Sequence, residues 1–284
     1  MNYGKRSTSK KRNALISRTS MLEKRAHVSF IRVLFTALIA VCVMVICLGI
    51  GSFRGVIAGA PDVNDVDISP LGYATFLYDD QGTQIRQLSA PTSNRLPVSL
   101  DQIPVSLQHA VVAIEDERFY EHNGIDVRGI ARAGMKAITT GNFSEGASTI
   151  TQQLVKNMYY DQNKTFARKA AEAWTALYVE RQLSKEEILE LYINTIYFGD
   201  GYYGLKEASL GYFGKEPQEL TDSEAILLAG IPNAPSAYAP SRHADLALQR
   251  EKQVLAAMVK YGYLEQSETD SLLWDAAADP VLAR

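Results

Sequence analysis

The chain has 284 residues, with 29 basic and 32 acidic side chains and a formal net charge of -3. This length allows one large domain or two small ones. Its two cysteines, Cys42 and Cys47, share one apolar stretch, which excludes a disulfide or a thiolate metal site elsewhere in the chain.

The N-terminal segment is strongly basic. Residues 1–32 carry nine Lys or Arg and one acid, Glu23, a net +8, and because the whole chain sums to -3 the remainder sums to -11. The segment is also polar and rich in Ser and Thr, so we expect a disordered tail. A basic tail suits either nucleic acid or an anionic membrane surface.

The next segment decides for the membrane. Residues 33–53 hold no charged side chain over 21 positions, a length that crosses a hydrocarbon core as a helix. Because the basic side precedes this span, we expect a cytoplasmic N-terminus and an exported remainder. A signal peptide cleaved after residues 58–60 is the alternative, but the long basic tail and the long apolar run favour a permanent anchor.

A linker and a hairpin come before the helical part of the chain. Residues 54–74 contain two prolines and scattered acids and are predicted to be a linker. Residues 75–78 and 83–86 are β-type segments on either side of the turn sequence Asp79-Asp80-Gln81-Gly82, which predicts a hairpin within residues 75–88. The pattern from there onward is helical.

Four helices are marked by periodicity and capping residues. Leu107, Val111, Ile114 and Arg118 are at helical spacing after Pro104. Capping boxes at residues 184–187 and 221–224 start two further helices, the second ending at Gly230, and residues 248–258 form another. We therefore expect a mainly helical domain with one small β element.

The first chemical motif closes the first of these helices. Residues 115–124 read Glu-Asp-Glu-Arg-Phe-Tyr-Glu-His-Asn-Gly. Glu115 follows an apolar run, where partial burial would raise its pKa and suit it to accept a proton, although most glutamates are simply solvated. Asp116 could orient Glu115 or cap a neighbouring backbone. His122 has no second ligand at metal spacing and is predicted to brace the loop before Gly124, a position that favours glycine.

Residues 125–147 join the first motif to the second and have an amphipathic, basic pattern. Arg128, Arg132 and Lys136 recur every four residues. The apolar positions of this segment are Ile125, Val127, Ile130, Met135, Ile138 and Phe143. The pattern fits a helix lying in a membrane interface and fits equally well a helix packed against the core.

The second motif, residues 146–153, opens a helix with polar side chains. Ser148, Gln152 and Lys156 share one face, and Ile150 and Leu154 take the other. Thr149 with Gln152 fits a capping box, which explains part of the motif. The wider polar stripe at a helix N-terminus suits a phosphate group or sugar oxygens.

Two later segments have ordinary structural interpretations when each is taken alone. Arg168 and Glu172 are an i, i+4 pair, which as a surface salt bridge is worth only about 0.3–0.5 kcal/mol. The glycine-rich residues 199–204 follow a helix and have the wrong spacing for a nucleotide cradle, so we expect a tight aromatic turn.

Together these motifs resemble family 51 of the glycosyltransferases, the peptidoglycan glycosyltransferases, known as monofunctional enzymes or as the N-terminal module of class A penicillin-binding proteins. The matching segments are Glu115-Asp116-x-x-Phe119-x-x-His122-x-Gly124, Gly146-x-Ser148-Thr149-x-x-Gln152-Gln153, Arg168-Lys169-x-x-Glu172, residues 188–199, and Arg250-x-x-x-Val254-Leu255. The resemblance covers roughly residues 75–265. One departure is Glu251, which stands where a second basic residue is common.

The resemblance implies a mainly α, lysozyme-like two-lobed fold. The predicted organisation is a basic tail at 1–32, a transmembrane anchor at 33–53, a linker at 54–74, the glycosyltransferase domain at 75–265 and a C-terminal tail at 266–284. Glu115 would be the catalytic base and Glu172 the second active-site carboxylate. The expected substrate-binding residues are Asp116, Arg118, Arg132, Ser148, Thr149, Gln152, Gln153, Lys156, Asn157, Arg168 and Lys169, with Arg118, Arg132, Lys156 and Arg168 as a cationic set around a pyrophosphate.

The implied activity is polymerisation of lipid II into β-1,4 glycan strands, with inversion and release of undecaprenyl pyrophosphate. No cofactor is required, no metal-ligating residue is assigned, and a divalent cation such as Mg or Mn could sit at the pyrophosphate. The expected partners are lipid II, the growing glycan chain, the bacterial cytoplasmic membrane and other cell-wall or division proteins, but no nucleic acid.

Three alternatives remain open from the sequence. The chain could be a truncated N-terminal part of a bifunctional penicillin-binding protein, although no Ser-x-x-Lys motif follows the last helix. It could be a lysozyme-like glycan hydrolase, which uses the same two-carboxylate logic. It could also be a non-enzymatic scaffold within a division complex.

Overall fold

The computed structural model of the chain describes residues 32–51, 54–55, 75–78, 80–81, 84–88, 95–141, 146, 148–160 and 165–274. The chain divides into two compact units, Met1–Ala58 and Gly59–Arg284. The predicted tail up to residue 31, nearly all of the predicted linker and residues 275–284 of the predicted C-terminal tail lie outside the described residues.

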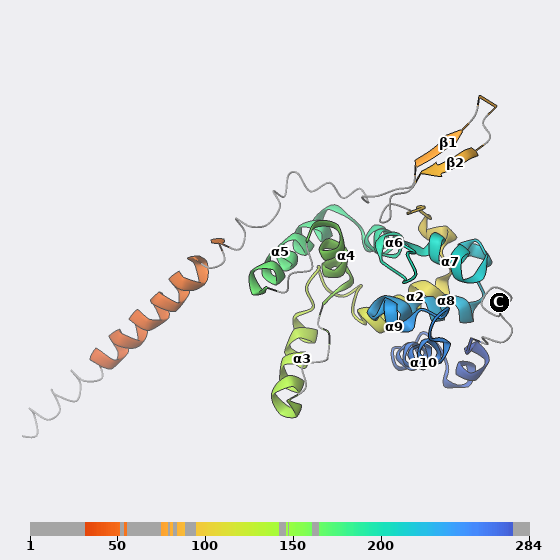
Figure 1. Cartoon of the computed structure of the whole chain (residues 1–284). Coiled ribbons are helices and arrows are strands. Elements are labelled where there is room, and N and C mark those ends of the chain that lie inside the picture. Colours follow the sequence, from red (N-terminus) through yellow and green to blue (C-terminus); the bar gives the residue numbers. More distant parts are fainter. Residues whose placement is uncertain are drawn as a thin grey trace, which may run out of the picture. The chain divides into compact units, whose positions relative to one another are not determined.

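The first unit contains one helix, Arg32–Gly51, which is long and apolar enough to cross a membrane by length and composition (Figure 1). Its large side chains are exposed within this unit; Val33, for example, keeps 65% of its surface. The helix agrees within two residues with the span predicted at 33–53. A helix satisfies its own backbone hydrogen bonds, which an apolar surrounding requires of any spanning segment.

The predicted hairpin is present. Strands β1 (Thr75–Tyr78) and β2 (Gln84–Leu88) form an antiparallel pair in which Thr75 lies opposite Leu88 and Tyr78 opposite Gln84. The register shifts at Tyr78, next to the turn. The two β-type segments and the turn sequence between them therefore identified this element correctly.

The remainder of the described domain is helical, which confirms the mainly α class. The α-helices are α2 (Val105–Glu115), α3 (Val127–Thr140), α4 (Ile150–Tyr159), α5 (Phe166–Gln182), α6 (Lys185–Thr195), α7 (Leu205–Phe213), α8 (Asp222–Gly230), α9 (Pro235–Tyr238) and α10 (Ala244–Lys260). Short 3-10 helices are η1 (Leu100–Gln102), η2 (Pro217–Glu219), η3 (Ile231–Asn233) and η4 (Gln266–Leu272).

The helices pack in two groups, as a two-lobed domain requires. Helices α2, α8 and α10 pack on one another, and α4 packs on α5 and α6 (Figure 1). Every residue of α8 from Glu224 to Gly230 is buried, so this helix lies inside the first group. Burial of apolar side chains such as Leu107, Ile188 and Ile226, all fully buried, is the main stabilising contribution of such a core.

The predicted helix starts are confirmed. Capping boxes are formed at Ser184 before α6 and at Thr221 before α8, and α8 ends at Gly230 as expected. In each box the hydroxyl accepts a bond from a backbone N–H that would otherwise have no partner. The predicted helix at 248–258 is also present and extends further in both directions, as α10.

One helix boundary differs from its prediction. The periodicity placed Arg118 on the first helix, but α2 ends at Glu115 and Arg118 lies in the following turns. At Asp116 the backbone leaves the helical region, with φ -157°. Periodicity reflects only the spacing of apolar residues. It does not detect the hydrogen bonds that the Asp116 side chain makes to residues far along the chain.

Helix α3 leaves its large apolar side chains exposed. Asp126 caps its N-terminus by accepting a bond from the Gly129 N–H, and Gly141 ends it in a left-handed conformation. Exposed fractions are 72% for Val127, 47% for Ile130, 67% for Met135 and 84% for Ile138. Packing of this face against the described core, one of the two predictions, is therefore wrong.

The chain after residue 265 belongs partly to the folded domain. Helix η4 contacts α10, and Trp274 is only 5% exposed, with its ring 6.4 Å from that of Phe213. The backbone N–H of Trp274 donates to both oxygens of the buried Glu251 carboxylate, at 3.1 Å each. Residues 266–274 are therefore not a free tail, because Trp274 completes the core beside α10.

Candidate active site

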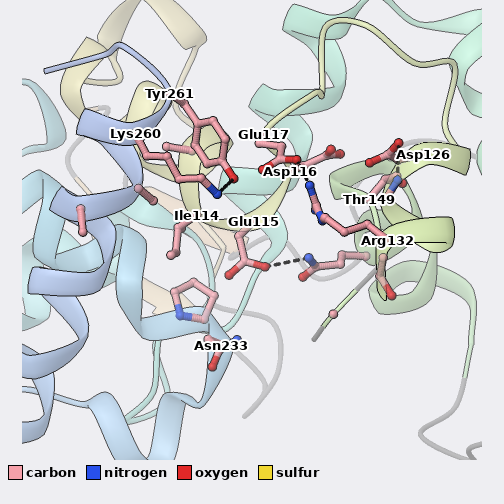
Figure 2. A pocket seen from close by; sticks show the side chains of 18 of the residues that line it. Ile114, Glu115, Asp116, Glu117, Asp126, Arg132, Thr149, Asn233, Lys260 and Tyr261 are labelled. Atoms are coloured by element: carbon pink, nitrogen blue, oxygen red, sulfur yellow. Dashed lines mark hydrogen bonds and ion pairs between the residues drawn. The ribbon is translucent and has the colours of Figure 1, made fainter. Parts of the chain in front are cut away.

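A polar cleft of about 730 Å³ lies between the ends of α2 and α10 on one side and of α3 and α4 on the other. Figure 2 shows Glu115 in its middle, with Lys260 and Tyr261 on one side and Arg132 and Thr149 on the other. Ionisable side chains dominate its lining: Glu115, Asp116, Glu117, Asp126, Arg132, Lys156, Arg250 and Lys260. Such a cleft suits a large, polar, charged substrate better than an apolar one.

Glu115 is the last residue of α2, and its side chain is 10% exposed, so the predicted partial burial is confirmed. Its Oε2 accepts a hydrogen bond of 2.8 Å from Gln153 Nε2 (Figure 2). Its Oε1 lies 3.9 Å from Arg250 Nη2 and has no hydrogen-bond partner among the described residues. One oxygen is thus held by Gln153, while the other is buried beside Arg250.

Asp116 fixes the end of α2 from the other side. Its buried carboxylate accepts the Ile150 N–H at 2.9 Å and the His122 Nε2 at 2.9 Å. The Gly124 N–H donates to His122 Nδ1, so the neutral ring with its proton on Nε2 satisfies both bonds. His122 therefore has the predicted bracing role, and of the two roles open to Asp116 the structure selects the backbone cap, at the start of α4.

Gly124 is required by its backbone conformation and by its neighbours. Its φ is +86°, and a Cβ built there would lie 2.8 Å from the Ala176 carbonyl oxygen. Its own carbonyl accepts a 2.7 Å bond from Thr149 Oγ1. The predicted need for glycine is confirmed, and the position joins the first motif to the second.

The polar stripe at the start of α4 serves two purposes. Thr149 and Gln152 form the predicted capping box, and both are buried. Gln152 is not among the residues that line the cleft, whereas Thr149, Gln153 and Lys156 are. A single substrate-facing stripe through Ser148, Gln152 and Lys156 is therefore not formed, because Gln152 turns back to the helix end.

Arg118 and Arg132 are paired with acids that the sequence did not single out. Glu117 bridges both guanidinium groups, and Arg118 also pairs with Asp126. The hydrogen bond with Asp126 is the main cause that raises the pKa of Arg118. Burial acts to raise the pKa of Asp126, but the bonds from Arg118 and from the Gly129 N–H outweigh it, and its pKa is lowered. Of the two arginines, Arg132 lines the cleft.

Of the predicted set of cations, Lys156 is the one that lines the cleft and has no ion pair among the described residues. Its pKa is lowered, mainly by burial and also by the charges of Lys169 and Arg168, while Glu172 and Glu115 act to raise it. A half-buried ammonium that repels its neighbouring cations gains most from an added anion.

Glu172 is fully buried below Lys156 and does not line the cleft directly. It forms ion pairs with Arg168 and with Lys169, whose Nζ lies 3.1 Å from Oε2. Lys169 Nζ also donates to Ser148 Oγ at 2.8 Å, which links this group to the rim of the cleft. The pair with Arg168 is thus buried rather than a surface bridge. Asn157, also predicted to bind substrate, is exposed on α4 outside the cleft lining.

The cleft contains residues that the sequence reasoning left out of the site. Arg250 was part of a recognised motif, and its position beside Glu115 could have been inferred from that motif alone. Asn233, Lys260 and Tyr261 line the same wall, and Lys260 Nζ donates to Tyr261 Oη at 2.7 Å (Figure 2). These three carry no local sequence signal, since η3 and α10 bring them to the cleft from far along the chain.

The turn at residues 199–204 is tight, as expected. Gly199, Gly201 and Gly204 have φ of 89°, 90° and 81°, and Tyr197 pairs with Tyr203 across the turn. These residues do not line the cleft.

The donor set for a divalent cation is weak in the described part of the chain. No group of three or more His, Cys, Asp or Glu is placed to hold a metal ion there. The Glu172 carboxylate, the best candidate, is already bound by Arg168 and Lys169. The described residues therefore form no metal site of their own, and a divalent cation held at the pyrophosphate stays a prediction.

Comparison with known proteins agrees with this geometry. The sequence model of the family described as Transglycosylase matches residues 81–259. Penicillin-binding protein 1F of Bacillus subtilis is 45% identical over 68% of this chain and 27% of its own length, and penicillin-binding protein 1A of Escherichia coli is 40% identical over 84% and 28%. This chain thus spans little more than a quarter of those two relatives.

A shorter relative matches over most of its length. A putative transglycosylase of Cupriavidus necator is 46% identical over 62% of this chain and 76% of its own length. The residues matched by the family model include all those that line the cleft except Lys260 and Tyr261. The chain belongs to the transglycosylase family.

Proposed function

We propose that this protein is a peptidoglycan glycosyltransferase that polymerises lipid II into β-1,4 glycan strands. The observation that carries the proposal is the Glu115 carboxylate, which lines a polar cleft together with the cation Lys156 and is held by the side-chain amide of Gln153. A fixed carboxylate beside an unpaired cation suits removal of a proton next to a departing anion.

In this mechanism Glu115 acts on the acceptor. The 4-hydroxyl of an incoming lipid II would lose its proton to the Glu115 carboxylate, and its oxygen would attack the anomeric carbon of the lipid-linked donor from the face opposite the pyrophosphate. The bond from that carbon to the pyrophosphate oxygen breaks, and its electron pair leaves with undecaprenyl pyrophosphate. Attack from the opposite face inverts the α-linkage to β.

The cations around the donor would stabilise the charge that develops on the leaving group. Lys156 is best placed because it faces the cleft and has no ion pair among the described residues. Glu172 would act indirectly, since its carboxylate holds Arg168 and Lys169 in position at the rim. Arg132 could contribute only by exchanging its bond with Glu117 for one with the substrate.

The N-terminal helix supports a place at the bacterial cytoplasmic membrane, where a lipid-linked substrate resides. We infer a single-pass arrangement with the basic N-terminus in the cytoplasm and the catalytic domain outside, because the basic residues precede the span. Both a monofunctional enzyme and the N-terminal module of a penicillin-binding protein fit the coverage of the relatives.

A glycan hydrolase would need a water molecule in place of the acceptor sugar and no anionic leaving group. Lys156 and the nearby Arg250 and Lys260 favour the pyrophosphate substrate instead. The test is to incubate the detergent-solubilised full chain with labelled lipid II. We expect a polymer that lysozyme digests, together with free undecaprenyl pyrophosphate; lipid II left intact, or short sugars without polymer, would contradict the proposal.

A further inference from the structure

A buried chain of hydrogen bonds runs from α6 to the Glu115 carboxylate. Tyr192 is fully buried on α6, and its hydroxyl donates to Gln153 Oε1 at 3.2 Å. The same Gln153 side chain donates from Nε2 to Glu115 Oε2 at 2.8 Å. A buried phenol costs free energy unless its hydroxyl is bonded, so Tyr192 is committed to this contact.

The chemistry of the two outer groups fixes the orientation of the amide between them. Burial, together with the charges of Glu115 and Asp116, raises the pKa of Tyr192 well above its ordinary value, so the phenol keeps its proton and can donate. An amide carbonyl accepts this proton, and the amide NH2 then faces the carboxylate. A rotated amide would direct its carbonyl oxygen at the Glu115 carboxylate, which is repulsive.

This orientation distinguishes the two oxygens of Glu115. Oε2 is occupied by Gln153, whereas Oε1 is buried at the cleft and has no hydrogen-bond partner among the described residues. Arg250 Nη2 is 3.9 Å from Oε1, which is too far for a hydrogen bond.

We propose that Tyr192 is a positioning residue that acts through Gln153 to hold the Glu115 carboxylate in place for accepting the acceptor's proton. The inference rests on the proposed function for the identity of the reaction. The acceptor O–H bond breaks, its proton goes to the Glu115 carboxylate, and its oxygen bonds the anomeric carbon as the pyrophosphate leaves with the electron pair. Tyr192 and Gln153 exchange no proton in this step.

Other charged and titratable groups also face Glu115, from each of the surrounding elements. They are Asp116 after α2, Lys156 on α4, Tyr192 on α6 and Arg250 on α10. A variant that removes only a hydrogen bond between Tyr192, Gln153 and Glu115 leaves the charged groups of Asp116, Lys156 and Arg250 in place. A change in the ionisation of Glu115 in such a variant is therefore attributable to this relay of hydrogen bonds.

The first test is Tyr192→Phe, which removes the hydroxyl and keeps the buried ring. A freed amide no longer stabilises the carboxylate anion, so the acidic limb of the pH profile for polymerisation should move to higher pH. The maximum kcat should fall roughly three- to tenfold, the range expected for one hydrogen bond, with little change in KM. Gln153→Met should do the same, and the double variant should add little to either change.

The matched control is Tyr212→Phe. Tyr212 is also buried, and its hydroxyl donates to the Phe198 carbonyl at 2.9 Å, away from Glu115. This variant removes the same atom from a buried tyrosine, so it should reproduce any loss of thermal stability but leave the pH profile in place. Equal pH profiles for the two Tyr→Phe variants, or additive effects of Tyr192→Phe and Gln153→Met, would overturn the relay.

A second readout separates this inference from the proposed function. Infrared titration of the carboxyl bands, taken as the difference between the full chain and its Glu115→Gln variant, isolates Glu115 without any turnover. In Tyr192→Phe that band should titrate at higher pH than in the unaltered chain and in Tyr212→Phe. An unaltered chain that fails to polymerise lipid II contradicts the proposed function, while an unmoved Glu115 band contradicts the relay.

Discussion

At the scale of single residues, the side chains of the site divide into those that face the cleft and those that hold them. The Asp116 carboxylate binds the first N–H of α4 and the ring of His122, so it ties the end of α2 to the start of α4. Thr149 and Gln152 use their polar atoms on each other at the helix start. Glu115 and Lys156 line the cleft, and we expect the chemistry to depend on these two.

Replacing Glu115 with Gln tests the base. The amide keeps the size of the side chain but cannot accept the proton, so polymerisation should fall by about 10²- to 10⁴-fold, the usual share of general base catalysis. Binding of a pyrophosphate-containing donor analogue, measured by calorimetry, should be nearly unchanged because Lys156 is intact. A variant that polymerises at the rate of the unaltered chain would place the base elsewhere.

Glu251 gives a prediction on stability rather than activity. It is fully buried, and burial raises its pKa to about 8, although the bond from the Trp274 N–H and the charge of Lys252 act to lower it. Between its ordinary pKa and about 8 the folded state binds more protons than the unfolded state. The free energy of unfolding should therefore fall as the pH rises through this window.

Glu251→Gln removes the ionisation and should flatten this dependence. The variant should gain stability relative to the unaltered chain at pH 8 and above, and the advantage should shrink as the pH falls toward 5. Thermal unfolding of the detergent-solubilised protein, followed by tryptophan fluorescence, measures both curves, since Trp274 lies on this carboxylate. Parallel curves for the two proteins would show that Glu251 does not titrate in this window.

At the scale of elements, α3 has the most unusual surface. Its apolar face is exposed to solvent, with Ile138 at 84%, and Arg128, Arg132 and Lys136 occupy the adjoining face. A helix with one apolar and one basic face suits the boundary between lipid tails and headgroups. Because the described core does not cover the apolar face, the membrane interface is the environment that we expect for it.

A pair of neighbouring labels on α3 tests this expectation. In a background with Cys42 and Cys47 replaced by Ala, a fluorophore at Ile138→Cys should be quenched by lipid-attached quenchers in proteoliposomes. The same fluorophore at Thr139→Cys, exposed on the basic side, should be quenched much less. Equal accessibility of both labels to a water-soluble quencher would place α3 away from the lipid.

At the scale of the whole molecule, the chain combines one apolar N-terminal helix with a separate helical domain. The charge step between the basic segment and the remainder predicts the direction of insertion. A lipid-linked substrate with a large polar headgroup requires the catalytic domain to lie next to the membrane on the side where that headgroup is presented.

Protease accessibility measures the orientation. Protease added outside intact spheroplasts should digest residues 75 onward and leave a fragment that contains the N-terminal helix. A cytoplasmic marker protein that stays intact controls for leakage. Protection of the catalytic domain under these conditions would reverse the predicted topology and remove the basis for lipid II as substrate.

The amino-acid sequence by itself determined the features that depend on near neighbours. The hairpin, the capping boxes at Thr149, Ser184 and Thr221, the apolar N-terminal helix and the special backbone at Gly124 were all predicted correctly. Each is set by interactions over a few residues, or by a uniform run of apolar side chains, so a local pattern is enough. The motifs also singled out Glu115, which lines the cleft; its role as the base stays a prediction.

Only the tertiary structure decided which partners these residues have. Gln153 reaches Glu115 across 38 positions of the sequence, and Asp116 reaches the Ile150 N–H across 34. The pairing of Arg132 with Glu117, the burial of Glu172 and the arrival of Lys260 at the cleft also had no local signal. The physical reason is that such contacts depend on how separate helices pack, and periodicity along one helix does not specify which residue of another helix it will face.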